Sequence, residues 1–109
     1  MTALKINTDG TMQPVEVIGK SIEKQNGCIY GYIGGHYDII QLSPDAVMLV
    51  DGDGHIKGLP LNPAAMMISG YSLLVGAALI LGQKYTPDGG IFTDCPERFV
   101  RFADRIQRM

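Results

Sequence analysis

The side chains best suited to chemistry are few, and they stand apart along the chain. Asp51, Asp53 and His55 form a short run, Asp-Gly-Asp-Gly-His, that is similar to the start of a calcium-binding loop. Such a loop needs an oxygen ligand where His55 stands and a bidentate glutamate where Asn62 stands, so the match fails. Glycine takes positive φ and aspartate bonds its own backbone, and the run therefore predicts a plain turn.

The cysteines and histidines show no catalytic or metal-binding spacing. Cys28, Cys95, His36 and His55 form no short pair of the kind that prearranges a zinc site. A nucleophilic cysteine needs a nearby base and a lowered pKa, whereas free cysteines are usually inert core residues. Neither a nucleophile elbow nor a glycine-rich phosphate loop is present. We therefore expect no catalytic residue, no metal and no cofactor, and a protein that is not an enzyme.

The stretch after the acidic turn, Gly-Leu-Pro-Leu-Asn-Pro, allows two interpretations. Its prolines, Pro60 and Pro63, make it stiff and extended. In the first interpretation Asn62 caps a helix that begins at Pro63, so that Asn62→Ala costs about 1 kcal/mol of stability. In the second, Lys57 and Asn62 line a cleft in which the stiff arm offers unpaired carbonyls to a ligand.

Four arginines recur at helical spacing near the end of the chain: Arg98, Arg101, Arg105 and Arg108. They share one face of a helix, about 130° from its apolar stripe at 100° per residue. A solvated face is the ordinary interpretation of such a stripe. The functional alternative is that the guanidinium groups bind phosphate, nucleic acid or an acidic protein groove through paired donors.

Length and composition limit the classes of protein to consider. We expect residues 1–109 to form a single domain, because 109 residues supply one hydrophobic core but not two. With 46% hydrophobic and 18% charged residues, the composition is that of a globular protein. The net charge of -2 disfavours a dedicated nucleic-acid binder. The start of the chain lacks the pattern of a secretory signal, which predicts a reduced, cytoplasmic setting.

The apolar patterns predict the elements that must position these residues. Alternating residues around a turn predict an opening β-hairpin over residues 4–17. Ser21 is a candidate N-cap for a short helix that Gly27 ends. Residues 28–33 and 36–42 flank two glycines and fit either a second hairpin or a helix-to-strand join.

The second half of the chain contains two strongly apolar stretches. Residues 46–50 predict a strand that is buried on both faces, and residues 73–81 predict a second buried strand or strand pair. A short helix over 63–68 lies between them, and turn residues make 86–90 a loop. The uncharged run between the turn and Gln83 is interrupted by Ser-Gly-Tyr-Ser and predicts no membrane helix.

The last element is an amphipathic helix over residues 95–108. Asp94 and Glu97 form a capping-box pattern, and apolar residues recur at helical spacing from Phe99 to Ile106. The whole pattern predicts an α+β fold, with a mainly antiparallel sheet, short helices and this C-terminal amphipathic helix packed on the sheet.

The centre of the chain resembles a family of uncharacterised proteins, number 3846 among the domains of unknown function. The resemblance rests on Val-Met-Leu-Val with its acidic-glycine turn, on Ile-Lys-Gly-Leu-Pro-Leu-Asn-Pro, and on Leu-Val-Gly-Ala-Ala-Leu-Ile-Leu-Gly. It is strongest over residues 47–82. It implies a small accessory protein of phages, plasmids and bacteria that carry mobile elements, and it brings no established activity.

The residues and the resemblance together favour a small non-catalytic binding protein. The leading hypothesis is an inhibitor of a host defence system, of anti-CRISPR or anti-restriction type, that acts by contact with a host protein. The alternative is a protein that sequesters a small nucleotide immune signal, with Lys57, Asn62 and the C-terminal arginines around a pocket. A nucleic-acid-associated accessory role comes third. Six methionines supply adaptable apolar surface, so a homo-oligomer is a further expectation.

Overall fold

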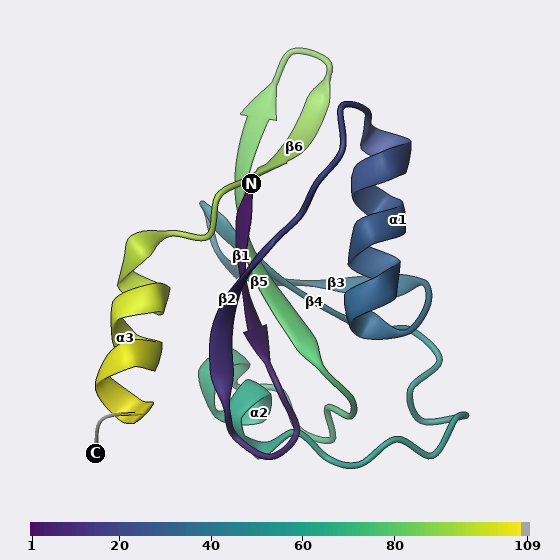
Figure 1. Cartoon of the computed structure of the whole chain (residues 1–109), viewed down its shortest axis with the longest axis vertical. Coiled ribbons are helices and arrows are strands. Elements are labelled where there is room, and N and C mark those ends of the chain that lie inside the picture. Colours follow the sequence, from purple (N-terminus) through teal and green to yellow (C-terminus); the bar gives the residue numbers. More distant parts are fainter. Residues whose placement is uncertain (108–109) are drawn as a thin grey trace.

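A computed structural model describes residues 1–107 as an α+β fold, in which three helices pack on a six-stranded antiparallel sheet (Figure 1). The elements in chain order are β1 (Thr2–Ile6), β2 (Met12–Glu16), α1 (Ile22–Ile33), β3 (Tyr37–Ser43), β4 (Ala46–Asp51), α2 (Pro63–Ser69), β5 (Ala78–Thr86), β6 (Gly89–Thr93) and α3 (Glu97–Gln107). Within residues 1–107, no helix is both long enough and apolar enough to cross a bilayer.

Strand β5 is the centre of the sheet, whose order is β2-β1-β5-β4-β3. The first half of β5 pairs with β1 on one side and with β4 on the other. Beyond Gly82 it pairs with β6 as a hairpin that extends past the rest of the sheet (Figure 1). Strand β3 stands at one edge of the sheet and pairs with β4 alone.

The two faces of the sheet carry separate halves of the core. All six residues of β4 are buried, and they alternate between the faces as a strand requires. Val47 and Leu49 pack in the cluster that α1 covers, whereas Met48 and Val50 belong to the cluster on the opposite face. That second cluster includes residues of α2 and α3, which lie across the sheet from α1 (Figure 1). The protein is therefore a sheet between helical layers.

The structure confirms several predicted elements and corrects the end of the first helix. The opening hairpin, the buried strand β4 and the short helix α2 are present as predicted. Ser21 caps α1 by accepting a hydrogen bond from the Lys24 amide, but the predicted helix end at Gly27 is wrong. The helix continues for another turn and a half because Ile29 and Ile33 bury against the sheet, which outweighs the cost of about 1 kcal/mol for a helical glycine. Gly34, at φ 101°, ends it instead.

The Gly-Gly pair at 34–35 is a helix-to-strand join, which settles the two alternatives left open for this region. The buried strand predicted over 73–81 begins only at Ala78. Before this strand, positive φ at Leu73 and Gly76 bends the chain. The backbone N–H of Asn62 donates a hydrogen bond to the Leu74 carbonyl in this segment. The loop predicted over 86–90 is a tight hairpin turn, since β6 starts at Gly89.

Helix α3 packs against β2 and the sheet as predicted, but its start differs. The Asp94 carboxylate does not form the predicted capping box. Its Oδ1 accepts a hydrogen bond of 2.7 Å from the Thr2 amide, which ties the segment before the helix to β1. The helix then begins at Glu97, after Pro96.

Candidate functional site

Asn62 is a buried structural residue. Its side chain is fully enclosed, and its Oδ1 accepts a hydrogen bond of 3.1 Å from the Ala65 amide, which caps α2. Its Nδ2 donates to the carbonyls of Ile6, at 3.1 Å, and Gly76, at 2.9 Å. The carboxamide therefore joins three separate segments, and the helix-cap interpretation describes what it does. It presents no atom to a ligand.

Lys57 is engaged in an ion pair beneath the turn that follows β4. Its Nζ lies 2.8 Å from Asp51 Oδ2 and donates to the Gly34 carbonyl at 3.0 Å. Burial raises the pKa of the Asp51 carboxyl, but hydrogen bonds from Lys57 and from the Asp53 amide outweigh it and leave that pKa below its ordinary value. Lys57 thus ties the end of α1 to the end of β4.

Replacing Lys57 with methionine is expected to lower the free energy of unfolding by about 2 kcal/mol at pH 7, because it leaves a buried carboxylate without its cation. In the variant, burial still raises the pKa of Asp51 and the Asp53 amide still lowers it, but the lowering by Lys57 is lost, so that pKa is higher than in wild type. The deficit against wild type is therefore full at neutral pH, shrinks as the pH falls through the higher pKa of the variant, and is lost below the lowered pKa of wild type. Urea unfolding across this pH range measures it, with Lys84→Met at an exposed site as control. A deficit that does not change with pH would contradict this role.

Two of the predicted arginines are held by neighbouring carboxylates. The Arg98 guanidinium donates two hydrogen bonds to the Asp45 carboxylate, of 2.9 Å and 2.6 Å, and a third to Ser43 Oγ. Hydrogen bonds from Arg98 hold the pKa of the Asp45 carboxyl well below its usual range. Arg101 pairs with Glu97 one turn earlier on the same helix. Arg98 therefore clamps α3 to the turn between β3 and β4.

The predicted binding residues do not share one pocket. Arg105 is exposed on α3, and Arg108 lies outside the described residues. Lys57 is anchored at the end of β4 and Arg98 at its start, and a strand of six residues separates these points by about 20 Å. Asn62 is fully buried, and its side chain bonds to Ile6, Gly76 and Ala65. A nucleotide pocket built from all of these residues is therefore not formed within one chain.

The titratable side chains are likewise dispersed. Within residues 1–107, no three histidine, cysteine, aspartate or glutamate side chains lie close enough to hold a metal ion. Burial raises the pKa of the Cys95 thiol to about 11, which keeps it protonated. Cys28 is half-buried, and its sulfur lies 3.6 Å from the Glu16 carbonyl.

The open edge of β3 is the best candidate for a binding site. No strand among residues 1–107 pairs with its outer side. The Gly52 amide donates to the His36 carbonyl, so the alternation of an antiparallel ladder turns the backbone groups of Asp38 and Ile40 toward β4. Those of Tyr37 and Ile39 then face outward, where a further strand would pair.

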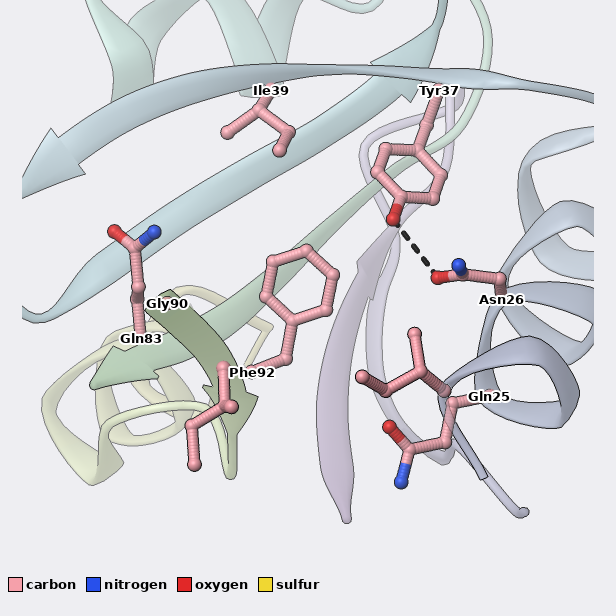
Figure 2. Close-up of a pocket in the computed structure, with 9 residues that line it drawn as sticks. Gln25, Asn26, Tyr37, Ile39, Gln83, Gly90 and Phe92 are labelled. Carbon is pink, nitrogen blue, oxygen red and sulfur yellow. Dashed lines mark hydrogen bonds between the residues drawn. The ribbon is translucent and has the colours of Figure 1, made fainter. Parts of the chain in front are cut away.

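A cavity of about 540 Å³ opens beside this edge on the face that α1 covers, and we call it the α1-side cavity (Figure 2). Ile22, Gln25, Asn26, Tyr37, Ile39, Gln83, Gly90, Ile91 and Phe92 line it. Within this lining, the Tyr37 hydroxyl donates a hydrogen bond of 2.9 Å to Asn26 Oδ1. Burial raises the pKa of Tyr37, so its phenol stays protonated and acts as a donor. The cavity is thus apolar with several uncharged polar groups.

A second cavity, of about 250 Å³, opens beside β3 on the other face of the sheet, and we call it the opposite-side cavity. Asp38, Ile40, His55 and the segment from Ser72 to Val75 contribute to its walls. In that segment Leu73 has φ 61° and an exposed side chain. A bulky residue with positive φ is a strained feature of the kind found at functional sites.

These residues of β3 were not among those singled out from the sequence. A signal was present, because Tyr-Asp-Ile-Ile-Gln-Leu places apolar side chains on both faces, with isoleucines at the adjacent positions 39 and 40. That pattern is typical of a strand in which neither face consists only of polar, solvent-exposed side chains. Its place at the sheet edge depends on which strands pair, and local pattern does not contain that information.

Comparison with known proteins identifies a family and nothing further. The family model for DUF3846, a domain of unknown function, matches residues 1–108. No curated protein and no solved structure matches the chain. Because the matched region is nearly the whole chain, the protein belongs to the DUF3846 family.

Proposed function

We propose that this protein is a non-catalytic binding protein that captures an extended segment of a partner protein along the open edge of β3. The observation that carries the proposal is an unpaired edge strand with a cavity on each of its faces. Strand addition at a sheet edge works in this way, because main-chain hydrogen bonds supply affinity and pockets for alternate side chains supply specificity.

The chemistry of the edge supports a protein partner. Ile39 is 53% exposed on the outer strand, although exposed edges in monomeric proteins are usually protected by charges, prolines or short length. A shift in register between Gln41 and Ser43 limits the usable edge to its first residues. Those are the residues beside the two cavities.

The proposed consequence for the partner is inhibition. A segment that is held as an extra strand of this sheet is withdrawn from its own fold or from its own ligand. The family resemblance suggests a phage or mobile-element setting, and there a host defence protein inside the cell is the partner that such an inhibitor would act on. A second copy of this chain is the competing occupant of the same edge, and the experiments below distinguish the two.

Replacing Ile39 with proline tests the proposal, because its amide faces outward and proline removes that donor without taking a hydrogen bond from β4. The probe is a displayed library of random peptides. We expect wild type to enrich peptides whose affinity falls about ten-fold or more for Ile39→Pro. The variant loses one backbone hydrogen bond to the peptide, and the proline ring keeps the peptide backbone from approaching β3 closely. Ile39→Val keeps the amide and should bind as wild type does.

A folded Ile39→Pro variant that binds the same peptides with unchanged affinity would contradict the proposal. Sedimentation of wild type and Ile39→Pro shows whether a second copy uses the edge, since a dimer that only the proline variant loses would assign the edge to self-association. For the inhibitory role, phages that a defence system restricts are plated on hosts expressing either form. We expect wild type, and not Ile39→Pro, to restore plating in a host whose defence protein is the partner.

A further inference from the structure

The lining of the α1-side cavity points to the side chain that it accepts. Its polar groups are the carboxamides of Gln25, Asn26 and Gln83 and the phenol of Tyr37, and no charged residue lines it among the described residues. A charge placed there would lose its hydration without gaining a counter-ion. The rings of Tyr37 and Phe92, with centroids 6.1 Å apart, form an aromatic wall. The occupant is therefore uncharged and large.

Gln83 adds a requirement for a hydrogen-bond donor. Its Oε1 is buried and accepts no hydrogen bond from the described part of the chain. Figure 2 shows the Gln83 carboxamide reaching from β5 toward Ile39, close to Gly90. The last torsion of a glutamine side chain is soft, so a small rotation offers this oxygen to a donor in the cavity. Tyrosine and tryptophan combine a large ring with such a donor, and both are frequent anchors of protein interfaces.

Asp38 determines the chemistry of the opposite-side cavity. Its side chain is exposed, and that side chain makes no hydrogen bond or ion pair within residues 1–107. Asp51 also contributes to this cavity, but its charge is already compensated by Lys57. Asp38 is therefore the carboxylate that remains available, and a lysine or arginine of the partner is its natural complement.

Strand geometry places these two preferences at neighbouring positions of the partner. A residue paired with Ile39 points to the same face as Ile39, into the α1-side cavity. The next residue along points to the other face, where Asp38 and Ile40 lie. Resting on the proposed function, we infer that the captured segment is an extended strand in which a tyrosine or tryptophan is adjacent to a lysine or arginine.

Selection from the displayed peptide library tests this inference with three baits: wild type, Ile39→Pro and Asp38→Lys. We expect the peptides that wild type enriches and Ile39→Pro does not to carry the aromatic–basic pair. Asp38→Lys should keep the aromatic residue and replace the adjacent basic residue by an acidic one. Asp38 is exposed, so this substitution leaves the fold intact, and the melting temperature verifies that.

Affinities for the most enriched peptide give the size of each contribution. Asp38→Asn should weaken binding roughly three-fold, as expected for an exposed ion pair, whereas Asp88→Asn, with the same change in net charge, should not. Gln83→Met should weaken binding roughly five-fold for the peptide with tyrosine and leave its tyrosine-to-phenylalanine variant unaffected.

The outcomes separate this inference from the proposal beneath it. Peptides that depend on the β3 edge but lack the aromatic–basic pair, with no change of preference in Asp38→Lys, would overturn the inference and leave strand capture standing. Enriched peptides that bind Ile39→Pro as well as wild type would overturn strand capture itself.

Discussion

Replacing Asn62 with alanine is expected to lower the free energy of unfolding by about 3–4 kcal/mol, far more than an ordinary helix cap contributes. The cap to Ala65 accounts for about 1 kcal/mol. The remainder arises because the carbonyls of Ile6 and Gly76 lose their buried donor. Chemical denaturation measures the loss, and a fall in melting temperature of roughly 10 °C or more should accompany it.

Ser21→Ala is the matched control for the cap alone, because Ser21 caps α1 at an exposed site. We expect it to cost about 1 kcal/mol or less. Asn62→Asp keeps the acceptor for Ala65 but removes both donated hydrogen bonds, and it should remain strongly destabilised. A loss for Asn62→Ala no larger than that for Ser21→Ala would show that the bonds to β1 and to the segment before β5 contribute little.

Gly82→Ala is expected to be the most damaging change of a single methyl group in the sheet. Gly82 is buried where β5 passes from β4 to β6, and a Cβ there would meet the Asp94 carbonyl and Thr93 Oγ1. The Asp94 carbonyl oxygen belongs to the backbone, so it cannot move without displacing the segment that joins β6 to α3. We expect a loss of about 3 kcal/mol or failure to fold, at the upper end of the range for overpacking.

Gly27→Ala provides the comparison for Gly82→Ala, since a Cβ at Gly27 meets no atom within 4 Å. In the middle of α1, alanine should stabilise the protein by about 0.5–1 kcal/mol. Urea midpoints of the two variants should therefore move in opposite directions. A Gly82→Ala protein as stable as wild type would show that the strand junction can widen, contrary to this account.

The sequence predicts those parts of the fold that depend on interactions between residues close together in the chain. The opening hairpin, β4 and α2 are specified by local alternation, turn residues and a capping asparagine, and all three are present. The end of α1 was misplaced because a glycine was weighed without the burial of Ile29 and Ile33 that follows it. Asp94 was misassigned as a cap because its partner, the Thr2 amide, lies at the other end of the chain.

The candidate site was harder to predict than the fold for the same reason. The charged residues chosen from the sequence are conspicuous in spacing, but Lys57 and Arg98 have carboxylate partners in the folded chain. The edge of β3 becomes a candidate only through sheet order, and the α1-side cavity beside it joins residues from four elements, as Gln83 and Asn26 illustrate. Uncharged residues of that kind carry no chemical signature in a sequence.

Hydrogen exchange of the β3 amides tests strand capture most directly, using the most enriched library peptide as the probe. In the free protein the outward amides of Tyr37 and Ile39 should exchange rapidly, whereas those of Asp38 and Ile40 are protected by β4. We predict that saturating peptide slows exchange at Tyr37 and Ile39. Peptide that binds while these two amides continue to exchange at the free rate would contradict the account.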